Sequence, residues 1–408
     1  MRILLWHGYL LGGTGSNVYT RSVAREWSRA GHEVVVVSQE PNPELADLGG
    51  AQTVRPDIGA LLPVFVLDRY EGMQAKLLQD TTTEERERFV DANAAVLREL
   101  APADLVFANH VLLGAPVGAA AGLPFAVKAH GSELEYSMRG NEELARWGRE
   151  TLADAGAVFV GSAHIREVLE DVVGHVDRVY EVPPGVDVDE FHPERRDNAL
   201  ANLVEEARRD PPNLGSANER LPDDGNADRF AAFFADEGPT LLYFGKLIRN
   251  KGVHLLLRAL ERVQAKAVIV GFGDYRHELE AMAGRNVLFT GPLEHRHLVH
   301  LIPLTDVTVV PSIFPEAFGM VAAEAAAGGS LPLVARHSGL AEIADALEEE
   351  GVPASFESGS VDDLVDKLEA LLGRPEPERE ELRRRARRVV EQRWSWATVA
   401  DRLLEPFT

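Results

Sequence analysis

The chain has 408 residues, of which 45% are hydrophobic and 26% charged, and its formal net charge is −23. This length exceeds the roughly 250–300 residues at which a single core stops growing, so we expect two domains. The acidic balance argues against nucleic acid or an anionic membrane as the main partner, because both require a basic field. The absence of cysteine excludes disulfides, thiolate metal ligands and cysteine nucleophiles.

Short apolar runs alternate with amphipathic stretches in the first half of the chain. The pattern predicts a helix over 17–30 and strands at 3–5, 34–38, 105–108, 125–129 and 158–161. Uninterrupted β-branched residues at 34–37 are typical of a parallel strand that is covered on both faces. The alternation therefore predicts an α/β domain with a doubly wound parallel sheet.

No targeting segment is recognised at the N-terminus, and the longest uncharged stretch, 111–127, is interrupted by glycine and proline. Such a stretch does not suit a spanning helix. We expect a soluble, cytoplasmic protein with at most weak membrane association.

The second half repeats the pattern after a turn-rich boundary at 182–193 and a polar insertion at about 194–238. We expect the insertion to hold one or two helices and loops. Predicted strands follow at 240–244, 267–271, 287–290, 307–310 and 331–334. Predicted helices lie at 253–263, 277–283, 298–303, 321–327 and from 383 to about 404. Two successive Rossmann-like domains are the expected architecture.

The loop Gly12-Gly13-Thr14-Gly15-Ser16-Asn17 lies between the first strand and the first helix. Backbone N–H groups at such a helix start can bind an anion or a sugar, and the alternative is a tight strand-to-helix turn. Val18 occupies the third glycine position of a dinucleotide fingerprint. No clear ribose-binding acid ends the second strand, where Ser38 and Gln39 precede Glu40, so a dehydrogenase is disfavoured.

Lys246 and Lys251, bracketed by Gly245 and Gly252, follow the first strand of the second domain. Cations at the carboxyl end of a parallel strand suit a diphosphate. A solvated loop is the alternative.

Two glutamates accompany a predicted helix start near Gly319. Glu316 lies in the preceding proline-bounded loop, and backbone N–H groups from Phe318 to Met320 would point out of the helix. Glu324 stands among alanines, where a carboxylate needs hydroxyl or N–H partners. A ribose would supply two hydroxyls, and an exposed helical glutamate is the alternative.

His130 ends a predicted strand, at an edge where doubly wound sheets bind ligands. A satisfied structural histidine is the alternative. His295, His297 and His300 resemble metal ligands, but residues two apart do not share a helix face. The Asp187-Val188-Asp189 triplet has a pattern that holds a divalent cation in other enzymes, but it lies in the turn-rich boundary, so we expect no metal.

Together these motifs resemble the retaining glycosyltransferases of family 4, the glycogen-synthase-like group 1 enzymes with the GT-B fold. The resemblance rests on the glycine loop, His-Gly-x-Glu at 130, Pro-x-Gly-Val-Asp at 183 and Gly-Lys-Leu-x3-Lys-Gly at 245. Gly-x-Gly at 271, and Glu-x7-Glu at 316 with Phe-Gly inside it, complete the series.

The resemblance implies roles for the donor site. Lys246 and Lys251 would bind the diphosphate of a nucleotide sugar, and Glu316 the sugar. Glu324, with Gly271 and Gly273, would bind the nucleoside. The N–H groups of Phe318, Gly319 and Met320, and the loop of Gly12 and Gly13, would hold phosphate and sugar oxygens.

His130 would sit at the sugar near the reacting centre. The acceptor side would include Asn17, Asn109, His110 and Glu133. The domains would span 1–187 and 188–392, with a final helix at about 393–408 returning to the first domain on Trp394 and Trp396.

Two features depart from the family pattern. Lys246 stands where the family more often has arginine. A lysine ammonium keeps the charge but lacks the two parallel N–H groups with which a guanidinium binds phosphate. The insertion at 194–238 is longer than the usual link.

The implied function is metal-independent, retaining transfer of a sugar from a nucleotide-sugar donor, with UDP expected, to a small soluble acceptor. A nucleotide-sugar epimerase, a pyridoxal-phosphate phosphorylase and a non-catalytic sugar-nucleotide-binding protein are the alternatives. The phosphorylase is disfavoured because no wider cofactor motif is seen. The sequence does not distinguish a monomer from a homodimer.

Overall fold

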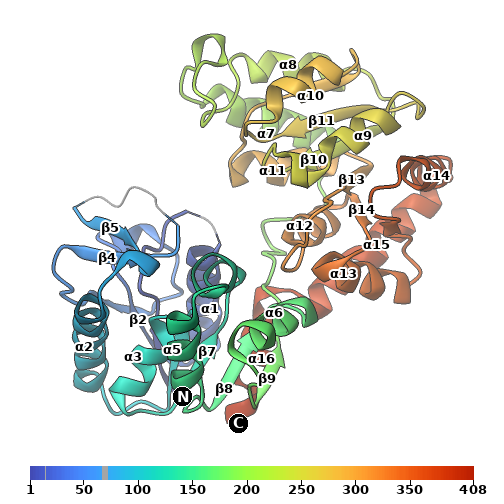
Figure 1. Ribbon diagram of the computed structural model, residues 1–408. Helices are drawn as coiled ribbons and strands as arrows, with labels where there is room; N and C mark the ends of the chain where they lie inside the picture. Colours follow the sequence, from blue (N-terminus) through green and yellow to red (C-terminus); the bar gives the residue numbers. More distant parts are fainter. Residues whose placement is uncertain (14, 67–71) are drawn as a thin grey trace. The chain divides into compact units, whose positions relative to one another are not determined.

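The computed structural model describes residues 1–13, 15–66 and 72–408, which form two compact units (Figure 1). The first unit comprises Met1–Gly185 and Trp396–Thr408, and the second comprises Val186–Ser395. Thr14, in the middle of the predicted glycine loop, lies outside the described residues.

The first unit is built on a parallel sheet of seven strands in the order β3-β2-β1-β6-β7-β8-β9. The central strand β1 pairs with β2 on one side and β6 on the other, so that Leu4 lies opposite Val35 and Val106. The strands are β1 (Arg2–Trp6), β2 (Glu33–Val37), β3 (Gln52–Val54), β6 (Leu105–Asn109), β7 (Phe125–Lys128), β8 (Ala157–Val160) and β9 (Val179–Glu181).

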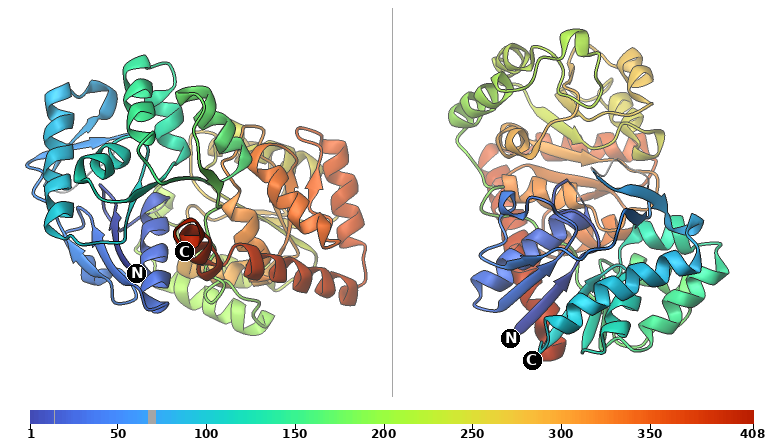
Figure 2. Two further views of the ribbon diagram at one scale, coloured as in Figure 1. Left: turned by 90° about the horizontal axis from the view of Figure 1, so that it is seen from below. Right: turned by 90° about the vertical axis from the view of Figure 1, so that its left-hand side faces the viewer.

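Alternate residues of this sheet enter two different cores, because successive side chains of a strand point to opposite faces. Leu4 and Trp6 pack with the helices on one face, and Ile3 and Leu5 pack with those on the other. Figure 2 shows helices on both sides of the sheet. The first face holds α2 (Thr83–Glu99), α3 (Gly114–Ala121), α5 (Glu142–Leu152) and α6 (Ala163–Val173), and the second holds α1 (Ser16–Arg29) and α16 (Trp396–Leu404).

Smaller elements complete the first unit. Two parallel strands, β4 (Leu61–Val64) and β5 (Gln74–Leu77), form a separate sheet that the sequence analysis did not predict. Pro63 inside β4 is the reason, since proline normally argues against a strand. After β7 the chain turns through α4 (Gly131–Glu133) and η3 (Leu134–Met138).

The second unit has a parallel sheet of six strands in the order β12-β11-β10-β13-β14-β15. The strands are β10 (Thr240–Phe244), β11 (Lys266–Val270), β12 (Val287–Phe289), β13 (Val307–Val310), β14 (Leu331–Ala335) and β15 (Ser355–Phe356). The helices include α9 (Val253–Ala259), α10 (Arg276–Met282), α11 (His295–Leu301), α12 (Met320–Gly328), α13 (Ser338–Glu349), α14 (Val361–Leu372) and α15 (Glu376–Arg393).

The predicted insertion forms α7 (Arg196–Arg208), the short turn η4 (Leu214–Ser216) and α8 (Asn226–Phe234). It is anchored to the second unit: the Asp223 N–H and the Asn226 amide both donate to the carbonyl of Thr290, at 2.8 and 2.9 Å. The insertion is thus an integral layer of this unit.

The predicted single helix from 383 to about 404 is wrong: α15 ends at Arg393 and α16 begins at Trp396. At Trp394 the chain leaves the helical path, and the Trp394 carbonyl accepts a hydrogen bond of 2.7 Å from the N–H of Val186. Trp394 packs edge-on against Phe318 in the second unit, and only Trp396 packs in the first unit, against Tyr19. The expected anchoring of Trp394 in the first unit is therefore also wrong.

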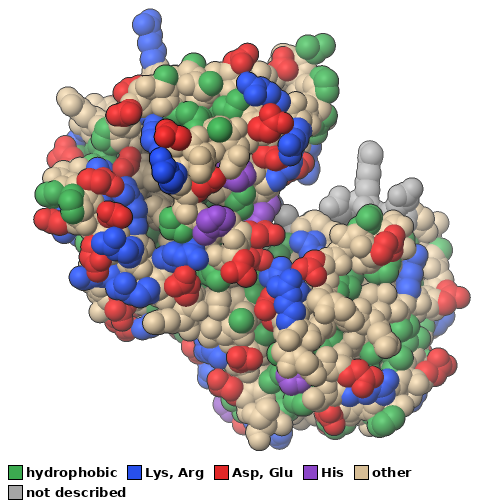
Figure 3. All heavy atoms as spheres, turned by 180° about the vertical axis from the view of Figure 1, so that it is seen from behind, with side chains coloured by type: hydrophobic (Ala, Val, Ile, Leu, Met, Phe, Trp, Pro, Cys, Tyr) green, Lys and Arg blue, Asp and Glu red, His purple; other side chains and the backbone are tan. Residues whose placement is uncertain are grey.

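Across the described residues, no helix combines the length and apolarity needed to cross a bilayer. On the face drawn in Figure 3, lysine and arginine side chains lie among aspartates and glutamates rather than in one basic field. This distribution agrees with the acidic net charge of −23.

Candidate functional site

The lysine loop of the second unit follows β10 directly. Lys246 is exposed, and its backbone carbonyl accepts a hydrogen bond of 2.8 Å from the hydroxyl of Tyr243. Burial and the nearby charge of Glu316 raise the pKa of Tyr243, so its hydroxyl stays protonated and holds the loop. The Lys246 ammonium makes no ion pair with any described residue.

Lys251 and Glu316 form a short ion pair in the predicted donor site. The Nζ atom of Lys251 lies 2.5 Å from Oε1 of Glu316. The side chains are 31% and 20% exposed, so the pair is open to solvent on one side. The structure thus brings together the cation predicted for the diphosphate and the carboxylate predicted for the sugar.

Glycines let these loops approach closely. A Cβ on Gly252 would lie 1.9 Å from the carbonyl oxygen of Pro311, and one on Gly271 would lie 1.8 Å from that of Gly245. Gly273 meets the carbonyl of Leu247 in the same way, at 2.4 Å. Only glycine fits such contacts, so the lysine loop, the Gly-x-Gly loop and the loop before α12 form one surface.

The N-terminus of α12 stands beside this surface. The backbone N–H groups of Phe318, Gly319 and Met320 have no hydrogen-bond partner within the described part of the chain. Gly319 has a φ of 112°, a conformation that favours glycine. Unpaired N–H groups and the helix dipole make this end of α12 suited to phosphate or sugar oxygens.

Glu324 lies one turn into α12. Burial raises the pKa of its carboxyl to about 7, against a smaller opposing effect of His295. Among the described residues its carboxylate has no hydrogen-bond partner. Glu324 is half-buried beside buried alanines, and its carboxylate is available to a ligand that brings its own hydroxyls.

The first unit places a group of histidines at the carboxyl ends of β1, β6 and β7. The rings of His110 and His130 lie 4.6 Å apart, and His7 stacks on His110 at 6.0 Å. Burial and the charge of His110 lower the pKa of His7 to about 3. Burial and the charge of His110 also hold the pKa of His130 well below 6.5. The rings of His7 and His130 are therefore neutral.

Hydrogen bonds determine which nitrogen of His130 carries the proton. Thr20 donates its hydroxyl proton to the carbonyl of Ser16 at 2.7 Å, so its oxygen can only accept from the Asn109 amide, at 3.2 Å. This turns Oδ1 of Asn109 toward Nε2 of His130, at 3.0 Å. Nε2 therefore carries the hydrogen, and Nδ1 carries the lone pair.

Glu133 fixes the backbone beneath the same ring. Its Oε1 accepts from the N–H groups of His130 and Val111 at 3.0 and 2.9 Å, and its Oε2 pairs with Nδ1 of His110. His130 and Glu133 also form a capping box, in which the ring faces the N–H of Glu133. The strand end is thus held rigidly.

Three predicted acceptor residues lie in the interior. Asn109 and Glu133 are fully buried and His110 is 2% exposed, and each bonds to protein groups. In the structure these side chains bond to one another and to the backbone around His130, and contact with an acceptor stays a prediction. Asn17, by contrast, is half-buried, and it bonds to Nε2 of His7 at 2.9 Å and to the carbonyl of Gly12.

The glycine loop differs from the expectation of free N–H groups. The carboxylate of Glu40 accepts from the N–H of Leu11 at 2.9 Å and, more weakly, from that of Gly12 at 3.4 Å. An anionic group therefore already occupies part of the loop. Gly13 has a φ of 90°, and a Cβ on it would lie 3.6 Å from the Asn17 amide, whereas one on Gly12 would meet nothing within 4 Å.

The three histidines near residue 297 point to different carboxylates. His295 pairs with Glu190 at 2.5 Å, His297 with Asp210 at 3.0 Å and His300 with Glu194 at 2.9 Å. Asp187 accepts the backbone N–H groups of Asp189 and Glu190 in a turn. Within residues 1–13, 15–66 and 72–408, no cluster of three such side chains is arranged to hold a metal.

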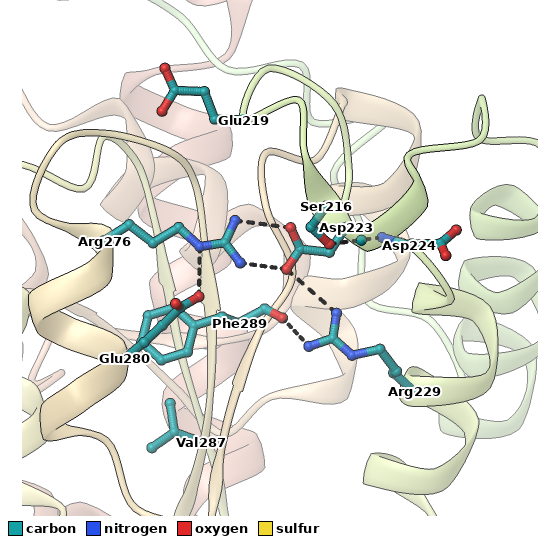
Figure 4. A pocket seen from close by; sticks show the side chains of 10 residues that line it. Ser216, Glu219, Asp223, Asp224, Arg229, Arg276, Glu280, Val287 and Phe289 are labelled. Carbon is teal, nitrogen blue, oxygen red and sulfur yellow. Dashed lines mark hydrogen bonds and ion pairs between the residues drawn. The ribbon is translucent and has the colours of Figure 1, made fainter.

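A cavity of about 550 Å³ lies elsewhere in the second unit, beneath the insertion (Figure 4). Arg276 forms two bonds to Asp223, at 2.9 and 2.6 Å, and a third to Glu280. Arg229 also reaches Asp223, at 3.5 Å. These ion pairs hold the insertion against α10. The residues that line the cavity do not include the predicted donor residues.

Sequence reasoning missed several residues that shape the two sites. Lys128 is buried, its Nζ donates to the carbonyl of Val182 at 2.7 Å, and burial lowers its pKa to about 7. Ser338 and His337 contact the Glu316 loop. Lys128 could have been noticed as a lysine inside an apolar strand, whereas the other two have no signal in the sequence.

Two sequence families match the chain, one for each half. The family described as Glycosyltransferase Family 4 matches residues 13–190. The family described as Glycosyl transferases group 1 matches residues 224–389. Between them the matches include every predicted site residue except Gly12.

Two curated relatives match about half of the chain. The D-inositol 3-phosphate glycosyltransferase of Xylanimonas cellulosilytica is 33% identical over 211 residues, 48% of this chain and 44% of that protein. A GDP-mannose-dependent phosphatidylinositol monomannoside mannosyltransferase of Corynebacterium glutamicum is 31% identical over 204 residues, 45% and 50% of the two chains. The chain thus spans half or less of these relatives' length in the matched segments.

A solved structure matches the whole chain. The HepE protein of Anabaena, determined in complex with UDP, superimposes with a TM-score of 0.69 at 17% identity over 99% of both chains. This similarity concerns the fold, and it confirms the expected GT-B architecture of two domains with parallel sheets.

Proposed function

Because the chain belongs to the group 1 glycosyltransferases of family 4, we propose that it transfers a sugar from a nucleotide-sugar donor to a hydroxyl of a small soluble acceptor. The observation that carries the proposal is the Lys251–Glu316 pair, 2.5 Å long, on the surface shared with the unpaired N–H groups of α12. Cations and helix amides suit a diphosphate, and a neighbouring carboxylate suits sugar hydroxyls.

In the proposed reaction the bond between the anomeric carbon and the β-phosphate oxygen breaks, and negative charge gathers on that oxygen. Lys246, Lys251 and the N–H groups from Phe318 to Met320 stabilise this charge. The acceptor hydroxyl attacks from the same face and gives its proton to that phosphate oxygen as the leaving group departs, so the configuration is retained. For His130 of the first unit we propose a role at the sugar as a neutral imidazole, because burial and the charge of His110 hold its pKa well below 6.5.

Lysine charges replace a divalent metal in this scheme, so we expect transfer to persist in excess chelator. Loss of activity in chelator, restored by magnesium or manganese, would contradict the proposal.

UDP is the proposed carrier because the Anabaena relative of the same fold is described in complex with UDP. The Corynebacterium relative is described as GDP-mannose-dependent, so the base needs direct measurement.

A thermal-shift panel of UDP, GDP, ADP and their glucose or mannose conjugates tests the proposal, since a bound ligand raises the unfolding temperature. We expect one nucleotide series to stabilise the protein, and its conjugate to donate sugar to an added cyclitol or monosaccharide. Epimerised donor in the absence of acceptor would indicate an isomerase instead. Binding without turnover across the acceptor panel would indicate a binding protein.

A further inference from the structure

Ser338 stands in an unfavourable backbone conformation beside the predicted donor site. Its φ is 46°, in the left-handed region that side chains other than glycine rarely adopt. Residues are held in such conformations when the surrounding structure requires it, often near functional sites. The hydrogen bonds of Ser338 show what its conformation maintains.

The hydroxyl of Ser338 connects Glu316 to His337. The backbone N–H of Glu316 donates to Oγ of Ser338 at 2.9 Å, and the carbonyl of Glu316 accepts from the N–H of Gly339 at 3.0 Å. Oγ of Ser338 lies 2.9 Å from Nδ1 of His337. Both backbone polar groups of Glu316 are thus held by the start of α13.

His337 joins the other end of the same loop. Its Nε2 lies 2.6 Å from the carbonyl oxygen of Ser312. A carbonyl only accepts, so Nε2 carries the hydrogen, and in the neutral ring Nδ1 accepts from the Ser338 hydroxyl. The bonds therefore run from Glu316 to Ser338 to His337 to Ser312, and they brace the loop at residues 312 and 316.

We propose that Ser338 and His337 are positioning residues that aim the carboxylate of Glu316 at the donor sugar. This inference rests on the proposed function. The Lys251 bond constrains the side chain of Glu316, and the Ser338–His337 chain constrains its backbone. Neither residue need touch the ligand.

The test measures the affinities of UDP and UDP-glucose, or of GDP and GDP-mannose if that series binds, for the wild type and for Ser338→Ala, Ser338→Gly and His337→Ala. All three variants should bind the nucleotide as the wild type does but lose about tenfold in affinity for the conjugate. Glu316→Gln should show the same pattern. Ser360→Ala is the control, because the Ser360 hydroxyl caps Asp363 at the start of α14 in the same unit.

Stability separates positioning from a merely structural role. Ser338→Gly relieves the backbone strain and should unfold at a higher temperature than Ser338→Ala, yet its conjugate affinity should remain equally low. Recovery of conjugate affinity in Ser338→Gly, or wild-type affinity in all three variants, would overturn the inference alone. A wild type that binds none of these nucleotides would overturn the proposed function and this inference together.

Discussion

Lys251 and Glu316 neutralise each other across 2.5 Å, although their sequence positions are 65 residues apart. A diphosphate that binds Lys251 must share it with Glu316, and a sugar that binds Glu316 must share it with Lys251. The pair therefore couples the two halves of a nucleotide sugar at one point of the second unit.

Lys251→Ala should weaken nucleoside diphosphate binding about 10- to 100-fold, because a charged hydrogen-bond donor is lost and Glu316 is left unpaired. Adding Glu316→Gln to this variant should recover part of the affinity, since the repelling carboxylate is gone. Titration calorimetry measures both effects. Lys367→Ala, an exposed lysine of α14, is the control and should bind normally. Equal affinity in Lys251→Ala and Lys367→Ala would remove Lys251 from the site.

Glu324 should make nucleotide affinity depend on pH. Its raised pKa of about 7 means that the carboxylate, which accepts hydroxyl hydrogens from a ribose, is lost as the pH falls through 7. Affinity should decline below pH 7 in the wild type. The Glu324→Gln variant serves as reference, because it retains only the pH dependence of the phosphates. Identical pH profiles for the two proteins would contradict this role.

Glu324 should also make the free energy of unfolding depend on pH. A carboxyl whose pKa is raised by folding holds its proton more tightly in the folded state, so stability falls as the pH rises from about 4.5 through 7. Glu324→Gln should lose this part of the pH dependence in thermal or urea unfolding. A steeper decline in the variant would show that the sign is wrong.

Asn109→Leu should lower the turnover rate about 100-fold, because His130 loses the acceptor that fixes its tautomer and ring. Nucleotide affinity should not change, since Asn109 belongs to the first unit whereas Lys246, Lys251 and Glu324 belong to the second. Nitrogen-15 NMR of His130 should show a mixture of tautomers in the variant and a single Nε2–H form in the wild type.

Asn93→Leu is the matched control for that experiment. Asn93 is also buried in the first unit, but it bonds to Trp6 and to the carbonyl of Phe89. The Asn93→Leu variant should be less stable than the wild type, but its His130 spectrum should be unchanged. Equal loss of turnover in both variants would indicate a general packing effect.

Gly252→Ala should separate the lysine loop from the loop before α12, because the new Cβ would lie 1.9 Å from the carbonyl of Pro311. Gly215→Ala has nearly the same backbone cost, with a φ of 63° against 68°, but nothing lies within 4 Å of its Cβ. The difference in unfolding temperature and nucleotide affinity between the two variants isolates the steric contact. Similar behaviour of both would mean that the close approach is unimportant.

Buried strands could be predicted from the sequence because their apolar runs are continuous. The strands β10 and β13 have the predicted bounds, whereas β3 and β9 are three-residue edge strands with exposed side chains and carry little signal. The break at Trp394 could not be predicted, since neither glycine nor proline marks it. It arises from a tertiary bond to Val186.

The proximity of the predicted donor residues Lys251 and Glu316 could be expected for a similar reason. Lys246, Lys251 and Glu316 lie in loops directly after strands of a parallel sheet, and glycines or prolines mark those loops. Burial of Asn109, His110 and Glu133 depends instead on side-chain partners that only the fold brings together. The contact between the Ser338 hydroxyl and the backbone of Glu316 likewise depends on the fold.

The most direct measurement of the central claim is a crystal structure of the protein with the nucleoside diphosphate that stabilises it most. We expect a pyrophosphate bonded to Lys246, Lys251 and the N–H groups at Gly319, with the ribose hydroxyls on Glu324. A pyrophosphate bound at any other part of the chain would contradict it.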